Sequence, residues 1–170
     1  MLEGRTLILN NLEVNQKLNR MAYQILEDIY QEEEVYMLGL QSGGYVLAEK
    51  VEKIINASNA KVKTNLVSVE VIKDNPASNE IKMEVDIETL RDKVIILFDD
   101  VANTGRVLTY AIRPLLSILP KKIRAMVLVD RRHKKYPITP DFVGLSLATT
   151  MQEHISVEVD DNQEITVFLN

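Results

Sequence analysis

The feature that most constrains the fold of this chain is a buried strand followed directly by two acids, a short polar turn and an amphipathic helix, over residues 91–119. Five consecutive apolar residues, Val94 to Phe98, predict a strand that is buried on both faces of a sheet. Asp99 and Asp100 follow where that strand would emerge. Beyond the turn, apolar residues recur every three or four positions, which predicts a helix with one buried face. These residues are Val107, Leu108, Ala111, Ile112, Leu115, Leu116 and Leu119.

The turn itself, Asn103 to Arg106, has the chemistry of a site for a phosphorylated sugar. Ligands of open α/β sheets bind beyond the carboxyl ends of the strands, and a helix that begins there points unpaired N–H groups at the ligand. Thr104 adds a hydroxyl donor, and Gly105 lets the backbone approach an anion. Ionised Asp99 and Asp100 only accept hydrogen bonds, which suits sugar hydroxyls and hydrated Mg²⁺. A buried strand with an acidic turn and an ordinary helix cap remains the structural alternative.

A second strand–turn–helix unit lies upstream. Val35 to Leu40 predict a strand, and residues 41–44 predict a small turn at its carboxyl end. Apolar residues at helical spacing then mark a helix: Leu47, Val51, Ile54 and Ile55. The backbone donors of Ser42, Gly43 and Gly44 can hold an anion. A tight strand-to-helix turn explains the same two glycines equally well.

The remaining pattern continues this alternation of strands and helices. A helix capped by Asn10 or Asn11 is predicted through about Gln31, and further buried strands at Ala125–Val129 and Phe142–Leu147. Alternating apolar residues predict half-exposed strands around Val67–Val71 and Ile81–Ile87, with turn formers between them, and a closing hairpin around residues 160–162. Such alternation predicts an α/β fold with a mostly parallel sheet covered on both faces, within a single domain of residues 1–170. Pro114 is expected to bend the central helix.

Composition excludes several classes of site. The chain has no cysteine, so disulfides, a thiol nucleophile and thiolate metal sites are excluded. Its net charge is −5, from 20 basic and 25 acidic residues, so the chain as a whole lacks the excess positive charge that is typical of nucleic-acid-binding proteins. No apolar run approaches the length of a membrane span, and the first ten residues lack the pattern of a secretory signal. We therefore expect a cytoplasmic protein that does not enter a membrane.

Two stretches carry a family resemblance. VIILFDDVANTGR resembles the signature of the type I phosphoribosyltransferases, which bind 5-phosphoribosyl-1-pyrophosphate (PRPP). VLVDRRHKKYPITPDFVG resembles the corresponding stretch of bacterial pyrimidine operon regulators that double as uracil phosphoribosyltransferases, and its PDFVG portion is also similar to the hypoxanthine-guanine branch. The likeness covers roughly residues 34–150. It implies a mostly parallel central sheet flanked by helices, with a small hood and a flexible hairpin.

The resemblance also implies an activity and a set of site residues. The expected reaction transfers the phosphoribosyl group of PRPP to a nucleobase and releases pyrophosphate, with Mg²⁺ as the cofactor and a homodimer as the working form. The family roles fall on four groups of residues. The expected catalytic and metal-binding residues are Asp99 and Asp100. The 5′-phosphate is expected to be bound by Asn103, Thr104, Gly105 and Arg106, and the pyrophosphate by Ser42, Gly43, Gly44 and Lys73. The base is expected to be bound by Phe142 and Val143.

Departures from the family pattern keep alternatives open. Gly43 stands where a cation is expected, and Val107 where a threonine is common, which favours a non-catalytic PRPP or nucleotide sensor as one alternative. Asn103 stands where purine enzymes commonly carry an aspartate, so uracil is favoured over hypoxanthine or guanine. The cluster Arg131–Lys135 suits a phosphate contact, a solvated loop or an RNA-facing patch, and supports an RNA-binding regulator as a further alternative.

Overall fold

The computed structural model describes residues 4–72, 75, 77 and 80–170. Its centre is a six-stranded sheet with strand order β4-β3-β2-β5-β6-β7. The strands are β2 (Glu34–Leu40), β3 (Lys63–Glu70), β4 (Lys82–Met83), β5 (Val94–Ala102), β6 (Lys122–Arg131) and β7 (Phe142–Leu147). All neighbouring pairs are parallel except β3 and β4, so the expected mostly parallel sheet is confirmed.

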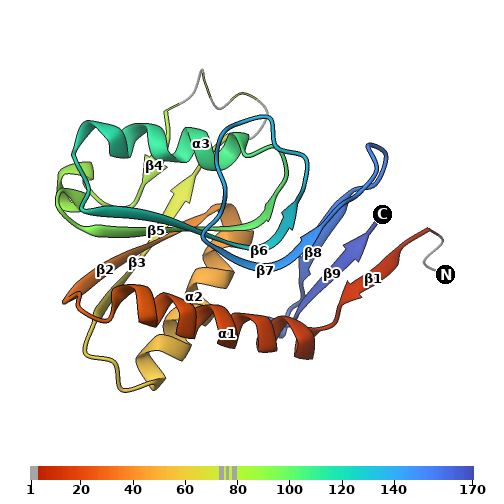
Figure 1. Cartoon of the computed structure of the whole chain (residues 1–170), viewed down its shortest axis with the longest axis horizontal. Helices are drawn as coiled ribbons and strands as arrows, with labels where there is room; N and C mark the ends of the chain where they lie inside the picture. Colours follow the sequence, from red (N-terminus) through yellow and green to blue (C-terminus); the bar gives the residue numbers. More distant parts are fainter. Residues whose placement is uncertain (1–3, 73–74, 76, 78–79) are drawn as a thin grey trace.

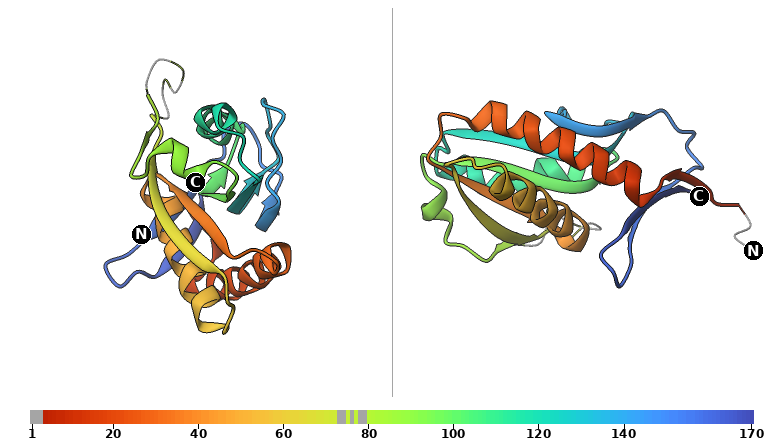
Figure 2. Two further views of the ribbon diagram at one scale, coloured as in Figure 1. Left: turned by 90° about the vertical axis from the view of Figure 1, so that its left-hand side faces the viewer. Right: turned by 90° about the horizontal axis from the view of Figure 1, so that it is seen from below.

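Helices cover both faces of this sheet (Figures 1 and 2). α1 (Asn11–Ile29) and α2 (Gln41–Ala57) pack on one face, and α3 (Arg106–Ile112) with the 3₁₀ helices η1 (Ile87–Leu90) and η2 (Arg113–Ser117) packs on the other. Successive residues of β5 alternate between the two hydrophobic clusters, with Ile96 on the α1/α2 side and Ile95 on the α3 side. Val94 to Phe98 are each at most 1% exposed, which confirms a strand buried on both faces.

Local signals in the sequence determine where the helices begin and end. Asn10 caps α1 with a reciprocal capping box, in which its side chain accepts from the Glu13 N–H and the Glu13 carboxylate accepts from the Asn10 N–H. The predicted helix after the acidic turn is divided: α3 ends at Ile112 and continues as η2. Pro114 explains this break, because its ring removes the backbone donor that an α-helix would need there.

A second, three-stranded sheet stands beside the first and forms the expected hood (Figure 1). It contains β1 (Thr6–Leu9), β8 (Ile155–Val159) and β9 (Ile165–Leu169) in the antiparallel order β1-β9-β8. Buried residues from all three strands join the cluster under α1 and α2, so the two sheets share a core. The β8–β9 turn is closed by the Asp160 carboxylate, which accepts from the backbone N–H groups of Asn162 and Glu164.

Three element boundaries differ from those expected. β5 runs to Ala102 rather than ending at Phe98, because β6 extends alongside it as far as Asp130. α2 begins at Gln41, directly after β2, so the expected turn 41–44 is in fact the first turn of a helix. The strand expected at Ile81–Ile87 is reduced to β4, since Ile87 already belongs to η1.

None of the helices in the described ranges is long and apolar enough to span a membrane.

Candidate functional site

The site is built at the edge of the sheet where the parallel strands β2, β3, β5, β6 and β7 all end. Asp99 and Asp100 lie in the last part of β5, not beyond it, and Asp99 pairs with Val127 of β6. Asp99 is only 3% exposed and Asp100 is half-buried. Burying a carboxylate is unfavourable unless it is paired, hydrogen-bonded or bound to a metal, so a buried acid at this edge indicates a specific role.

The two acids hold the backbone that follows each of them. The Asp100 N–H donates to Asp99 Oδ1 at 2.9 Å, and the Val101 N–H donates to Asp100 Oδ1 at 2.7 Å. Each of these charge-assisted hydrogen bonds fixes one carboxylate through its Oδ1 atom. Carboxylate oxygens are the acceptors that sugar hydroxyls and a hydrated cation require.

After β5, the loop 103–105 leads into α3 with a backbone form that requires glycine. Gly105 is the N-cap of α3 and has φ of 82°, in the left-handed region. A Cβ at Gly105 would also lie 2.7 Å from Ile138 Cγ2. A small cavity of about 70 Å³ opens between this loop, the end of β5 and the start of α3, and its lining includes Asp99 and all four predicted 5′-phosphate residues, Asn103, Thr104, Gly105 and Arg106.

The second predicted unit meets the first at this edge. Gly44 packs so closely on β5 that a Cβ there would lie 2.2 Å from the Phe98 carbonyl oxygen. Gly43 packs on the acid: a Cβ there would lie 2.5 Å from Asp100 Oδ2. The start of α2 is also set by Gln41, whose φ of 57° turns the chain sharply out of β2. The structure therefore brings Gly43 and Gly44 beside the acids, but in the first turn of a helix, while Ser42 lines a separate cavity with Glu70 and Val71.

The loop between β6 and β7 closes the site from the other side. Backbone N–H groups of Lys135 and Tyr136 donate to the Thr104 carbonyl at 2.9 and 3.1 Å. Lys134 turns inward and donates to carbonyl oxygens of Ala102 and Asn103 at 3.2 and 3.3 Å. Sequence reasoning treated the basic cluster Arg131–Lys135 as a unit and missed this inward lysine, because nothing in a run of cations marks which side chain turns toward the protein.

Two buried polar atoms in this region have no hydrogen-bond partner within the described part of the chain. They are Asn103 Oδ1 and His133 Nε2. Orphaned buried polar atoms are rare in native structures and are common at sites that receive a ligand or a water molecule. Asn103 is one of the predicted phosphate-loop residues, so its orphaned oxygen supports a ligand at this loop.

The expected base-binding residues lie at the start of β7. Phe142 pairs with Met126, the partner of Phe98, and it is 8% exposed and belongs to the hydrophobic core on the α1/α2 side of the sheet. Val143 pairs with Val127, the partner of Asp99, so Val143 is level with that acid two strands away and is half-buried. Phe142 is thus a core residue in this structure, and base binding by Phe142 and Val143 stays a prediction. Lys73 lies outside the described residues.

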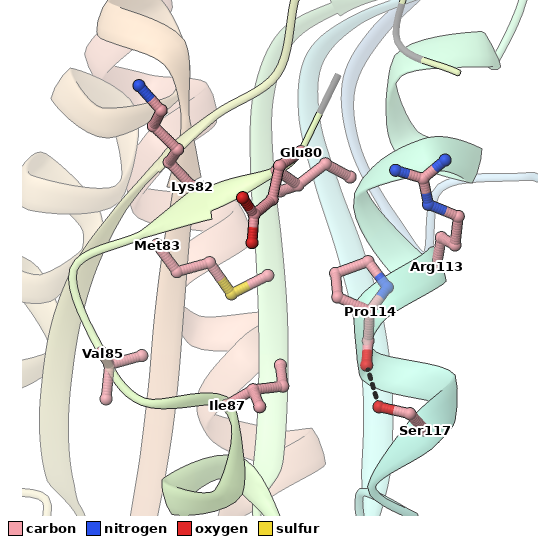
Figure 3. Close-up of a pocket in the computed structure, with 9 residues that line it drawn as sticks. Glu80, Lys82, Met83, Val85, Ile87, Arg113, Pro114 and Ser117 are labelled. Atoms are coloured by element: carbon pink, nitrogen blue, oxygen red, sulfur yellow. Dashed lines mark hydrogen bonds between the residues drawn. The ribbon is translucent and has the colours of Figure 1, made fainter. Parts of the chain in front are cut away.

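A larger cleft of about 610 Å³ lies on the α3 side of the sheet, between β4 and η2 (Figure 3). Figure 3 shows Met83, Val85 and Ile87 facing Pro114 and Ser117 across it, with the Ser117 hydroxyl donating to the Pro114 carbonyl at 2.8 Å. None of the predicted site residues within the described part of the chain lines this cleft. We therefore place the functional site at the carboxyl edge, where the acids and the phosphate loop meet.

Comparison with known proteins identifies the family of this chain. Residues 4–162 match the model of the phosphoribosyl transferase domain. The chain is a phosphoribosyltransferase-family protein. Its curated relatives include the protein named bifunctional protein PyrR from Ligilactobacillus salivarius, 33% identical over 165 residues that cover 91% of each chain, and the protein of the same name from Clostridium kluyveri, 33% identical with 92% of each covered. The resemblance found in the sequence is thereby confirmed.

Solved phosphoribosyltransferase structures share the fold. A hypoxanthine-guanine phosphoribosyltransferase from Bacillus anthracis aligns with a TM-score of 0.70 at 19% identity, covering 84% of this chain and 82% of its own. A hypoxanthine phosphoribosyltransferase from Staphylococcus aureus aligns with a TM-score of 0.72 at 17% identity, covering 88% of this chain and 80% of its own. At these identities the likeness concerns the fold of the phosphoribosyltransferase domain and confirms the expected fold class.

The donor set at the edge suits Mg²⁺ held jointly with a substrate. Within residues 4–72, 75, 77 and 80–170 no group of three or more His, Cys, Asp or Glu side chains forms a complete metal cage. Asp99 lines the cavity of the phosphate loop, and Asp100, the next residue of β5, lies beside Gly43 at the start of α2. Mg²⁺ characteristically binds through one or two carboxylates together with water and substrate phosphates, so two acids are sufficient.

Proposed function

We propose that this phosphoribosyltransferase transfers the phosphoribosyl group of PRPP to a nucleobase, with uracil preferred, and releases pyrophosphate. The observation that carries the proposal is the meeting of Asp99 with the loop Asn103–Arg106 around one small cavity, with Asp100 next in β5 and beside Gly43 of α2. In a family whose members share this domain, that arrangement supplies acceptors for a sugar and donors for a phosphate within one site.

In the proposed reaction, a ring nitrogen of the base bonds to C1 of the ribose as the bond from C1 to the pyrophosphate oxygen breaks, and the proton of that ring nitrogen passes to solvent or to the departing pyrophosphate. The sugar gains positive charge in the transition state, and Asp99 and Asp100 would stabilise that charge while accepting ribose hydroxyls. Backbone donors at Asn103 to Arg106 would hold the 5′-phosphate, and those of Ser42 to Gly44 the pyrophosphate. Bound Mg²⁺, held by the two acids, would neutralise negative charge on the pyrophosphate.

Uracil is preferred on two grounds. The curated relatives carry the name bifunctional protein PyrR, and the DRRHKKYP stretch resembles regulators of that type that also act on uracil. Asn103 carries an amide where purine enzymes commonly carry a carboxylate, and an amide cannot act as a general base. The purine-specific structural neighbours share the fold at under 20% identity, so they do not argue for a purine.

A non-catalytic PRPP or nucleotide sensor is the second candidate. Gly43 has no cation to offer pyrophosphate, and the Asp100 carboxylate occupies the space that a side chain at residue 43 would need. The RNA-binding alternative has less support, because Arg131 donates to Thr149 and to the Thr150 carbonyl, and Lys134 donates within its own loop region. Those contacts leave Arg132 and Lys135 as the exposed cations of the cluster.

The deciding experiment measures pyrophosphate release from PRPP and Mg²⁺ with uracil, hypoxanthine, guanine and xanthine at equal concentration. We expect turnover with uracil, little with the purines, and none without Mg²⁺. Turnover of a purine alone would overturn the base assignment, and tight PRPP binding without pyrophosphate release would favour the sensor. The cytoplasmic homodimer of single domains stays a prediction, which sedimentation of the purified protein tests for the dimer.

A further inference from the structure

Lys134 belongs to the basic cluster Arg131–Lys135, and its ammonium group forms hydrogen bonds within the protein. Its side chain is 24% exposed, and its Nζ lies within hydrogen-bond distance of four acceptors. These acceptors are the Ala102, Asn103 and Arg131 carbonyl oxygens, at 3.2, 3.3 and 3.0 Å, and the Asp130 carboxylate. An ammonium group has three N–H donors, so these acceptors saturate it.

The neighbouring backbone completes the contact with the phosphate loop. The Thr104 carbonyl accepts from the N–H groups of both Lys135 and Tyr136. Three consecutive carbonyl oxygens, at Ala102, Asn103 and Thr104, are therefore all bound by the segment 134–136. The side chain of Lys134 accounts for two of the three.

The direction of these carbonyls determines the direction of the amides that follow them. A trans peptide is planar, and its N–H points away from its C=O. Holding the carbonyls of Ala102, Asn103 and Thr104 on the side of segment 134–136 turns the N–H groups of Asn103, Thr104 and Gly105 to the opposite side. Successive N–H groups that converge in this way form an anion-binding concavity.

We propose that Lys134 is a positioning residue for the 5′-phosphate: it contacts the loop from behind and orients the backbone donors, without contacting the substrate. The inference rests on the proposed function. The inference also gives a role to the half-buried ion pair, since Asp130 neutralises the Lys134 ammonium and holds it against the loop.

The test compares Lys134→Met with Lys135→Met. Both variants remove one positive charge at neighbouring positions, but the Lys135 side chain is exposed, while its backbone N–H, which any residue other than proline supplies, is what binds Thr104. Isothermal titration would measure ribose 5-phosphate and pyrophosphate separately. We expect Lys134→Met to weaken ribose 5-phosphate binding roughly 10- to 100-fold, the range found for residues that orient metal ligands.

Three further readouts separate positioning from a general structural role. Pyrophosphate affinity should change little in Lys134→Met, the KM for PRPP should rise more than kcat falls, and Lys134→Arg should restore part of the affinity. An equal loss of ribose 5-phosphate affinity in Lys134→Met and Lys135→Met would overturn the inference, because long-range charge would then explain both. Unchanged ribose 5-phosphate affinity in a folded Lys134→Met protein would overturn it as well. A wild-type protein that binds neither PRPP nor ribose 5-phosphate would instead overturn the proposed function, and this inference with it.

Discussion

Gly43 and Asp100 are in direct contact at the point where α2 begins and β5 ends. A Cβ built on Gly43 would lie 2.5 Å from Asp100 Oδ2 and 2.9 Å from Asp100 Cγ. The Asp100 carboxylate, a predicted metal ligand, can therefore occupy its observed position only because residue 43 has no side chain. A basic residue at this position, as the family pattern would suggest, carries the same Cβ and would displace the same acid.

We therefore predict that Gly43→Ala weakens Mg²⁺-dependent PRPP binding while changing the free energy of unfolding by less than about 1 kcal/mol. The stability effect is small because the Asp100 side chain can rotate away, and because alanine favours a helix over glycine by about 1 kcal/mol. Titration calorimetry and denaturant unfolding measure the two quantities. In a double-mutant cycle, Asp100→Ala should remove any unfolding penalty of Gly43→Ala; a penalty that persists would place the clash elsewhere.

The acid pair is tested by Asp99→Asn and Asp100→Asn. We expect each variant to lose at least about tenfold in Mg²⁺-dependent PRPP affinity, since one lost charge-assisted contact costs about 1.5–3 kcal/mol. Asp99→Asn should also lower the unfolding free energy more, because Asp99 is buried and Asp100 is half-exposed. Asp161→Asn in the exposed β8–β9 turn is the matched control for charge. PRPP affinity equal to wild type in both site variants would remove them from the site.

Glu34 makes stability depend on pH in the acidic range. The Lys93 ammonium, the Asn65 amide and the Lys63 ammonium lower the pKa of the Glu34 carboxyl from 4.5 to about 2. A depressed native pKa means that the unfolded state binds the proton more readily, so the stabilisation is full above about pH 4.5 and is lost as the pH falls toward 2.

The measurement is urea unfolding of wild type and Glu34→Gln between pH 7 and pH 2. We expect a difference of roughly 1 kcal/mol at neutral pH, smaller than the full shift implies because Lys93 is 38% exposed and the pair is screened by solvent. That difference should shrink to near zero at pH 2. Glu88→Gln, which removes the more exposed ion pair with Arg91, is the control, and an equal pH dependence there would deny Glu34 a special contribution.

The choice of base is tested at Asn103. Changing Asn103→Asp introduces the carboxylate that purine enzymes commonly carry, and general acid–base catalysis typically contributes about 10²–10⁴-fold. We expect the ratio of hypoxanthine to uracil turnover to rise about tenfold or more, measured at equal PRPP. Asn162→Asp, the same change in the exposed hairpin turn, should leave the ratio unchanged. A constant ratio in Asn103→Asp would show that the base is selected by other residues.

The sequence by itself determined the parts of the fold that depend on local pattern. Five apolar residues in a row predicted a strand with both faces buried, Asn10 or Asn11 predicted the start of α1, and Pro114 predicted a disturbance of the central helix, which the structure shows as the change from α3 to η2. The sequence also predicted a phosphate loop from an acid pair, a threonine and a glycine between strand and helix, because ligands of α/β sheets bind at the carboxyl ends of strands; its ligand stays a prediction. These features depend on neighbours within a few residues, which the sequence displays directly.

Only the tertiary structure decided the features that depend on register and on distant partners. The parallel pairing of β7 with β6 sets Phe142 opposite Met126 and so inside the core, although its apolar character suited a base equally well. The contact of Gly43 with Asp100 joins segments more than fifty residues apart, and the inward turn of Lys134 depends on carbonyl oxygens at the end of β5. Hydrophobic period reports which face of an element is buried. It does not report how far along a neighbouring strand each residue lies, and that position decides which side chains reach the site.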